Sequence, residues 1–449
     1  MLVPANFLLR KFPTAQKAFL LGFSLVFFAT FGLSGLWLYL IIAFLNYWLT
    51  LAIAEAPSDS AKRALLGLTV AFDLGALALF KYADFIGTQI FRLPFVAVVD
   101  ALPWDPLWRP IALSFYVFHM ISYAIDIRTA KYKPARPLDY ALYLSFFPHL
   151  IAGPIVRGNQ LIPQLETPRK PANFDIRGGL YDYCTGFLLK VCADRIGAII
   201  DSYWVGGAHE SLGAAGHWLV ALLYSSQIFG DFAGYTFMAI GISRLLGYVL
   251  PQNFNAPYIA ATFQTFWRRW HITLSLFLRD YLYIYSLGGN RVGTFRSYLN
   301  VLITMLLGGL WHGASWNFVI WGGVHGSALV IEKAAGMEKR RGLPVQALWW
   351  LVVQVTVIIA WVFFRSPTLH DAASFVRCMF APIHHGLNPQ LLYASVFMAP
   401  MIAHHVARIP ALKTEWMAHW APQGAIAGIA ITLAILLYDY PAAFIYFNF

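Results

Sequence analysis

Charged residues are scarce in this sequence. They make up 12% of the 449 residues, whereas a soluble domain carries roughly 25%. So few charged side chains cannot cover the water-exposed surface of a soluble protein of this length. Hydrophobic residues reach 59%, and the mean hydropathy is +0.60. The composition therefore excludes an ordinary soluble domain and predicts an integral membrane protein in contact with a lipid bilayer.

Cysteine is also rare, because only Cys184, Cys192 and Cys378 are present. Their number is odd and they form no CxxC pair, so we predict neither a disulfide framework nor a cysteine-ligated metal site. We also expect no metal site elsewhere and no permanently bound cofactor. The GxSxG, Walker A, HExxH and GxGxxG motifs are absent as well. A membrane enzyme that relies on histidine without a serine partner is expected to transfer a group between two bound ligands.

Basic residues outnumber acidic ones, and the formal net charge is +11. No stretch alternates basic residues with stacking aromatics on a polar surface, so we predict no binding to nucleic acid. Cytoplasmic loops of membrane proteins collect Lys and Arg. The basic segments 128–136, 169–177 and 333–341 therefore predict a multi-pass protein with these loops in the cytoplasm.

Long apolar runs are abundant, and a spanning helix needs about 20 mostly apolar residues. The sequence predicts one all-α polytopic membrane domain over 1–449, with about eleven transmembrane helices. The first run is interpreted as a membrane element rather than a signal peptide. The predicted helices cover 17–31, 35–54, 64–82, 111–127, 178–200, 216–243, 297–312, 316–332, 346–364, 388–407 and 423–440.

Two further segments, 138–158 and 253–291, do not fit a simple span. The first is interrupted by Pro148, Gly153 and Pro154, and the second carries several charged residues among apolar ones. Charged or non-helical backbone at membrane depth is tolerated only where protein or water surrounds it. We therefore predict that both segments are re-entrant or interfacial elements that line a cavity.

His271 lies in the second of these segments, within FWRRWHITLS (266–275). If this stretch is one helix, His271 shares a face with Trp267 and Ser275, because residues four apart lie on the same side. Arg268 then lies closer to the opposite side. The arginines are expected to reach lipid phosphates, whereas His271 belongs to the aromatic, buried face.

His312 lies in GGLWHGASWNF (308–318), where Gly309 and Gly313 allow a second helix to approach closely. Two interpretations are open at this point. His312 is either a structural residue bonded to a carbonyl group or a catalytic one. Ionisable groups inside a membrane are expensive and are functional by default. A neutral imidazole is also a suitable general base.

His325 lies in WGGVHG, on the next predicted helix, beyond a turn near Trp316 and Asn317. Gly322 and Gly326 permit close packing around it. A structural hydrogen bond is the simpler interpretation of this residue.

The ordered motifs resemble the membrane-bound O-acyltransferase superfamily, and more narrowly its bacterial polysaccharide O-acetyltransferases of the alginate type. The resemblance runs from about residue 35 to the end of the chain. The segments that carry it are SFYVFHMISYAID (114–126), FFPHLIAGPIVR (146–157), DFAGYTFMAIGIS (231–243), PQNFNAPYI (251–259), FWRRWHITLSLFLRDYLYI (266–284), LGGNR (287–291) and GGLWHGASWNFVIWGGVHG (308–326).

This resemblance implies a ring of tilted helices around a thin central tunnel, with a catalytic core at about 110–335. It implies that His312 is the catalytic base and that His271 is the second polar catalytic position. It further implies that the remaining site residues line the substrate tunnel. These are Trp267, Trp270, Trp311, Ser315, Trp316, Asn317, Asp231, Tyr235, Arg279, Asp280 and His325.

The resemblance also implies a reaction and its partners. An acyl group, most readily acetyl from acetyl-CoA or from another thioester such as an acyl carrier protein, enters from the cytoplasm. It reaches a hydroxyl of an exported polysaccharide, or a periplasmic partner of the SGNH-hydrolase type. The expected location is the bacterial inner membrane.

Two alternatives remain open. Phe237 stands where the alginate-type branch usually has an acidic residue, and this position looks closer to the D-alanyl transferases of teichoic acid. The second alternative is a different class of protein, either one that binds a cofactor through histidine ligands or a transporter. Haem binding would require histidines that face each other across helices.

Overall fold

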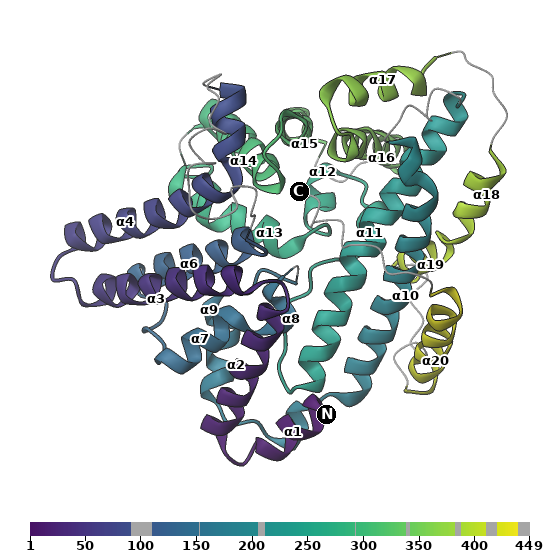
Figure 1. Cartoon of the computed structure of the whole chain (residues 1–449). Coiled ribbons are helices and arrows are strands. Elements are labelled where there is room, and N and C mark those ends of the chain that lie inside the picture. The colour runs from purple at the N-terminus through teal and green to yellow at the C-terminus, as the bar shows by residue number, and fades with distance from the viewer. Residues whose placement is uncertain are drawn as a thin grey trace. The chain divides into compact units, whose positions relative to one another are not determined.

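The computed structural model describes residues 1–90, 110–151, 153–204, 212–291, 293–337, 342–381, 388–409 and 420–438. These residues contain helices and no strand (Figure 1), which confirms the all-α prediction. Part of the predicted basic segment 333–341, namely 338–341, lies outside the described residues. The chain forms two compact units. The first comprises Met1–Gly179 and Ala239–Pro251, and the second comprises Leu180–Met238 and Gln252–Phe449.

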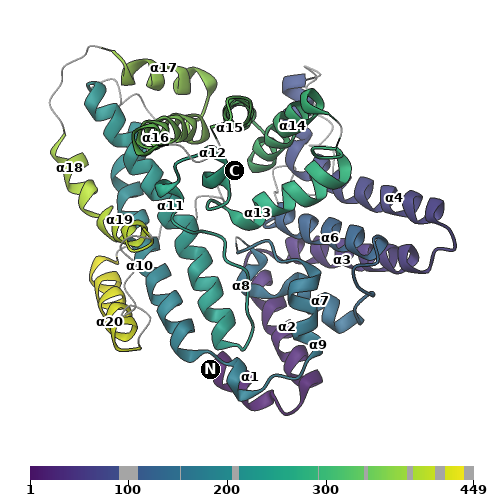
Figure 2. The ribbon, with the colours of Figure 1, turned by 180° about the vertical axis from the view of Figure 1, so that it is seen from behind.

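The first unit is built around three neighbouring helices, α3, α4 and α6, which lie side by side in both views (Figures 1 and 2). Helix α2 packs on α7 and α8 in the same unit. Its elements are α1 (Leu2–Leu9), α2 (Pro13–Ala29), α3 (Leu33–Glu55), α4 (Asp59–Leu77), the π-helices η1 (Ala78–Tyr82) and η2 (Phe85–Ile90), α6 (Leu113–Arg128), α7 (Pro137–Ser145), α8 (Phe147–Leu150), α9 (Gly158–Glu166) and the 3₁₀-helix η3 (Pro171–Asn173).

A buried polar contact joins α3 and α4 within this unit. The side-chain amide of Asn46 donates to both carboxyl oxygens of Asp73, over 2.9 and 2.8 Å. Both residues are fully buried. Polar contacts of this kind hold apolar helices together where water is excluded.

The interruption predicted in 138–158 is confirmed. Helix α7 ends at Ser145, and α8 begins at Phe147 with Pro148 in its first turn. A proline fits the first turn because the amide hydrogen it lacks has no partner there. A ring nitrogen of His149, Nε2, lies 3.0 Å from the carbonyl oxygen of Tyr143 and bridges the break.

The second unit contains the segments with the predicted site. Two long helices, α10 (Ile176–Ile200) and α11 (Ala214–Leu245), have residues in both units. The other elements of the second unit are the 3₁₀-helices η4 (Asp201–Tyr203) and η6 (Pro257–Ile259), α12 (Phe263–Trp267), α13 (Ile272–Phe277), the π-helix η7 (Leu278–Ser286), α14 (Thr294–His312), α15 (Trp316–Ala334), α16 (Leu343–Arg365), α17 (Leu369–Met379), α18 (Pro389–Val396), α19 (Ala399–Val406) and α20 (Trp420–Leu437).

Glycines bring α14 and α15 into close contact. A Cβ atom added to Gly309 would lie 2.1 Å from the carbonyl oxygen of Phe318, and one added to Gly322 would lie 2.3 Å from that of Met305. No side chain fits in such a space. The close approach predicted from the small residues is therefore confirmed, and it fixes α14 against α15.

The predicted helix over 388–407 is wrong in one respect, because two helices occupy it. Helix α18 ends at Val396, and α19 begins at Ala399 with Pro400 in its first turn. Proline there cannot supply an amide hydrogen for a helix that continues from α18. The other predicted spans each contain a helix or, for 64–82, an α-helix followed by a π-helix.

Among the described helices, three are long and apolar enough by themselves to cross a membrane. They are Leu33–Glu55, Asp59–Tyr82 and Leu343–Arg365, and the shorter apolar helices are Pro13–Ala29 and Gln423–Leu437. The count of about eleven transmembrane helices, the single domain over 1–449 and its core at 110–335 stay predictions.

Candidate functional site

His271 lies in a turn, which corrects the prediction of one helix through 266–275. Helix α12 ends at Trp267 and α13 begins at Ile272. His271 itself has a left-handed backbone conformation, with φ 42° and ψ 55°. A residue other than glycine adopts this conformation at a cost, and it does so mostly where surrounding contacts enforce it.

Asn253 supplies those contacts. Its side-chain oxygen Oδ1 lies 3.0 Å from Nδ1 of His271 and accepts from the amide and the hydroxyl of Thr273, over 3.2 and 2.9 Å. Its backbone carbonyl accepts from the amide of Ile272. An amide oxygen only accepts, so Nδ1 of His271 carries the hydrogen, and Nε2 of the neutral ring carries a lone pair. Among the described residues, Nε2 has no hydrogen-bond partner.

His312 is the last residue of α14 and is 4% exposed. The turn to α15 lies at 313–315, slightly before the predicted position near Trp316 and Asn317. Ser315 begins α15 by accepting a hydrogen bond from the amide of Asn317. A serine at this position satisfies one of the free amides at a helix start.

Trp311 joins the two histidines. Its ring centroid lies 5.0 Å from that of His312 and 6.2 Å from that of His271. The histidines are 41 residues apart in sequence, and all three side chains are buried. The turn at His271 and the end of α14 therefore meet around one indole ring.

A shell of aromatic rings surrounds His312. The rings of Trp321 and Phe364 lie 5.0 and 5.2 Å from it. Trp321 also contacts His325, at 4.9 Å. The sequence pointed to neither Trp321 nor Phe364, because both belong to apolar helix faces and only the packing of α15 and α16 brings them to the site.

His325 lies on α15, as predicted, and is fully buried. Phe266 stacks on its ring at 5.9 Å, and Trp267 meets its edge at 5.1 Å. Trp270 belongs to the same aromatic region, where it packs against Trp361 at 4.8 Å. Trp267, Trp270 and His325 thus lie near the two predicted catalytic histidines.

Other predicted tunnel residues have different surroundings. Trp316 is 44% exposed, whereas Trp321 takes the place beside His312. Asn317 is buried and donates to the carbonyl oxygen of Ser366 over 2.6 Å. Its role in the structure is to join the start of α15 to the end of α16.

Four charged or polar residues of the prediction lie on α11 and η7. Asp231, on α11, forms an ion pair with Lys190 over 2.7 Å. Arg279 and Asp280 pair with each other on η7 over 2.6 Å. Tyr235 is half-buried on α11. The Lys190–Asp231 pair balances charge in a buried position, whereas the side chain of Arg279 is 57% exposed.

A cavity of about 320 Å³ adjoins the aromatic region and is lined by α12, α13, η7, α14 and α15. Trp267 and Ser275 are in its wall, together with the two cationic residues Arg268 and Arg279. Apolar walls with a few polar groups are typical of small-molecule sites. The cavity thus brings together Arg268, Ser275 and Arg279. Trp267 and Ser275 also meet in its wall, although they belong to separate helices, α12 and α13.

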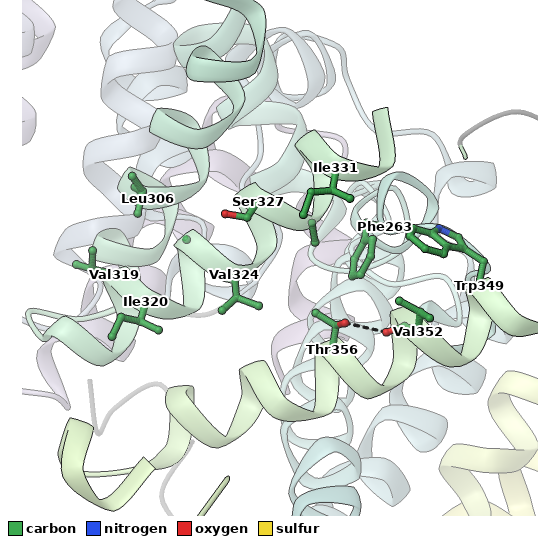
Figure 3. A pocket seen from close by; sticks show the side chains of 12 residues that line it. Phe263, Leu306, Val319, Ile320, Val324, Ser327, Ile331, Trp349, Val352 and Thr356 are labelled. Atoms are coloured by element: carbon green, nitrogen blue, oxygen red, sulfur yellow. Dashed lines mark hydrogen bonds between the residues drawn. The ribbon is translucent and has the colours of Figure 1, made fainter. Parts of the chain in front are cut away.

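A larger pocket, of about 640 Å³, lies on another face of α15, against α14 and α16 (Figure 3). Its lining is apolar apart from the hydroxyls of Ser327 and Thr356. The hydroxyl of Thr356 donates to the carbonyl oxygen of Val352 over 2.8 Å. His325 of α15 therefore lies in the aromatic region, whereas this pocket presents mainly apolar surface.

The site has the chemistry for proton transfer. Histidine accepts a proton as neutral imidazole and donates one as imidazolium near neutral pH. The rings around His312 exclude water, which strengthens electrostatic interactions in such a site. The cavity beside Trp267 has room for part of a ligand.

Comparison with known proteins gives this site a context. Residues 107–337 match the sequence model of the MBOAT, membrane-bound O-acyltransferase, family. The chain is 40% identical over 370 residues to "Probable alginate O-acetylase AlgI" of Azotobacter vinelandii. The aligned region covers 82% of this chain and 73% of that protein. It is 36% identical over 400 residues to a peptidoglycan O-acetyltransferase of Helicobacter pylori, covering 82% and 74%. A teichoic acid D-alanyltransferase of Bacillus subtilis is 30% identical over 231 residues, covering 48% and 56%.

Proposed function

The chain belongs to the membrane-bound O-acyltransferase family and is an acyltransferase, and we propose that it transfers an acetyl group from a thioester to a hydroxyl of an exported polysaccharide. The main structural support is the convergence of His271 and His312 on the ring of Trp311. Relatives that act on alginate and on peptidoglycan match four fifths of the chain, and both are named for O-acetyl transfer.

In this proposal His312 is the general base. Its imidazole takes the proton of the acceptor hydroxyl as the hydroxyl oxygen attacks the acyl carbonyl carbon. General base catalysis of this kind contributes about 10²–10⁴-fold to a rate. The buried position beside Trp311, Trp321 and Phe364 supports this role, since neutral imidazole is the form that accepts a proton.

His271 orients the acceptor in this proposal. Asn253 holds the ring with its hydrogen on Nδ1, so Nε2 is free to accept a hydrogen bond from a hydroxyl. The fixed tautomer supports a positioning role, because an acceptor hydroxyl aligned by Nε2 needs no reorientation before reaction.

The cavity beside Trp267 is the proposed site for the thioester. Its apolar wall suits an acyl chain or linker, and Arg268 and Arg279 suit the phosphates of coenzyme A. The proposed donor is acetyl-CoA, with an acyl carrier protein as the alternative thioester. The proposed location is the inner membrane of a bacterium, with a glycan or an SGNH-hydrolase-like periplasmic protein as the acceptor.

The test is the variant His312→Ala in the host that carries the protein. We expect the variant to be inserted in the membrane at the normal level and the exported polysaccharide to lose its ester-linked acetate. Acetate is measured after mild alkaline release from the purified polymer. Acetylation that survives in this variant would contradict the proposed function.

D-alanyl transfer is the second candidate, because Phe237 stands where the alginate-type branch usually has an acidic residue and resembles the teichoic acid D-alanyl transferases at this position. The D-alanyl relative covers a smaller share of the chain than the acetyl relatives do, which favours acetyl. Measuring ester-linked D-alanine in the same alkaline extracts separates the two candidates. Loss of D-alanine rather than acetate in His312→Ala would select the second.

A further inference from the structure

The rings of Trp267, Trp321 and His325 form a compact group. The centroid of His325 lies 4.9 Å from that of Trp321 and 5.1 Å from that of Trp267, and the two indoles are 5.7 Å apart. We call these three residues the ring triad. All three are buried.

The polar atoms of the ring triad lack partners. Among the residues that the structure describes, neither ring nitrogen of His325 has a hydrogen-bond partner, and neither does Nε1 of Trp267 or of Trp321. Leaving one buried polar group unpaired costs roughly 1–3 kcal/mol. Four such atoms on three touching rings are unusual, because native proteins satisfy nearly all buried polar groups. The group therefore has the character of a binding site for a polar ligand atom.

The donor inventory identifies the ligand chemistry. An indole only donates, and a neutral imidazole donates with one nitrogen and accepts with the other. The ring triad thus offers three N–H groups and one lone pair. Three N–H groups suit an oxygen atom that carries negative charge, and the lone pair is left for an N–H or O–H group of the same ligand.

The position of the ring triad connects it to the reaction. Trp321 also contacts His312, at 5.0 Å, and Trp267 lines the cavity of about 320 Å³. We propose that the ring triad binds the carbonyl oxygen of the acyl group and stabilises the negative charge that forms on it during transfer. This inference rests on the proposed function, and it gives His325 a catalytic role beside His312.

The step is balanced as follows. The acceptor hydroxyl oxygen forms a bond to the acyl carbonyl carbon, its proton moves to His312, and the π electron pair of the carbonyl moves to the carbonyl oxygen. The pair on oxygen then reforms the carbonyl while the C–S bond breaks, and the sulfur leaves with the electron pair of the C–S bond and takes the proton from His312. The carbonyl oxygen is fully charged only between these events, so hydrogen bonds from the ring triad that strengthen at this stage lower the barrier more than they strengthen thioester binding.

The deciding variant is His325→Phe. Phenylalanine has a similar shape and removes two unpaired nitrogens, so a merely structural His325 predicts an unchanged kcat and a Tm that is no lower. The proposal predicts the same Tm with a kcat about 10²–10³-fold lower, the range for loss of one such donor, and little change in KM for acetyl-CoA. His325→Gln, which keeps an N–H group, should recover part of the lost kcat.

The assay uses the purified full-length protein in proteoliposomes, with acetyl-CoA and alginate oligosaccharides, and follows the release of free thiol. His217→Phe is the matched control. His217 is a buried histidine of α11 whose Nδ1 bonds to the carbonyl oxygen of Gly213 over 3.0 Å, and it lies outside the ring triad. Its kcat should equal that of the unmodified protein.

Equal kcat values for the unmodified protein and His325→Phe would overturn the inference, and would indicate that the ring triad holds only an internal water. If His325→Phe does not fold, Trp267→Phe is the second variant, and an unchanged kcat there would overturn the inference in the same way. Failure of the unmodified protein to transfer acetyl either to a glycan or to an SGNH-hydrolase-like periplasmic protein contradicts the proposed function instead, so the two failures are distinguishable.

Discussion

Nδ1 of His271 donates a hydrogen bond to the side-chain oxygen of Asn253 over 3.0 Å, although 18 positions separate the two residues. The same oxygen accepts from the backbone and the side chain of Thr273. One amide oxygen therefore fixes both the turn between α12 and α13 and the tautomer of the imidazole. The hydrogen that His271 carries on Nδ1 determines that Nε2 is its accepting atom.

Replacing Asn253 should impair activity through His271. In Asn253→Ala the imidazole loses its partner and is free to rotate or to change tautomer. We expect kcat for acetyl transfer to fall by roughly 10–100-fold, below the full contribution of an acid–base group. The measurement is the initial rate of thiol release from acetyl-CoA at saturating acceptor.

Asn253→Asp is the matched control for this prediction, because its side chain still accepts hydrogen bonds from His271 and Thr273. It should retain more activity than Asn253→Ala. A rate for Asn253→Ala equal to that of the unmodified protein would mean that the tautomer of His271 has no part in catalysis.

The close contact between α14 and α15 predicts intolerance of a single methyl group. Gly309→Ala and Gly322→Ala would each place a Cβ atom within 2.3 Å of a backbone oxygen. The helices must then separate, and overpacking of this kind costs typically 1–3 kcal/mol. We expect lower thermal stability in detergent for both variants, together with a lower kcat, since His312 ends α14.

Gly323→Ala is the matched control on the same helix. A Cβ atom added there would meet only a side-chain methyl of Leu306, at 3.5 Å, which is ordinary contact. Its Tm should equal that of the unmodified protein or exceed it slightly, because alanine favours helices. Equal losses at Gly322 and Gly323 would show that helix composition, rather than the close approach, determines the effect.

Lys190 lies between two carboxylates, those of Asp194 and Asp231. Its side chain is 15% exposed, and that of Asp231 is 4% exposed. In Lys190→Ala the two acids lose the cation that they share, and breaking a buried ion pair costs about 3–5 kcal/mol. We expect a clear fall in the free energy of unfolding, measured by SDS titration in mixed micelles. Lys190→Arg should lose much less, and a stable Lys190→Ala would contradict the pairing.

The helices of this protein could be predicted from sequence because each apolar run is long enough to form one, and a helix satisfies all its backbone hydrogen bonds within a single segment, as lipid surroundings require. The break at Val396–Ala399 was missed, because Pro400 lies inside an otherwise continuous apolar run. The turn at His271 was missed for a different reason. The contact that enforces it comes from Asn253, and local sequence does not indicate such a contact.

The candidate site was predictable only in part. His271, His312 and His325 stand out because ionisable residues are expensive in apolar surroundings. Trp321 and Phe364 do not stand out, since tryptophan and phenylalanine are common throughout the chain and only packing selects these two. Asp231 could be singled out from the sequence, but its partner could not. Its ion pair with Lys190 depends on the packing of α10 against α11.

Glu332 should control the position of α12 and thereby that of the site. Its buried carboxylate accepts from the first backbone amides of α12, those of Phe263 and Gln264, over 2.6 and 2.9 Å. It also accepts from Nε1 of Trp349 over 3.0 Å. An acid at a helix start accepts hydrogen bonds from the free amides and interacts favourably with the positive end of the helix dipole. Glu332→Ala leaves these donors without their partner, at a cost of roughly 1–3 kcal/mol for each one that stays buried. We therefore expect a lower Tm and a lower kcat together, because α12 carries Trp267 and leads into the turn at His271. Glu332→Gln keeps one accepting oxygen, so its Tm and its kcat should lie between those of Glu332→Ala and those of the unmodified protein. A variant Glu332→Ala with unchanged Tm would show that water replaces the carboxylate at no cost, and that α12 is held by its aromatic contacts alone.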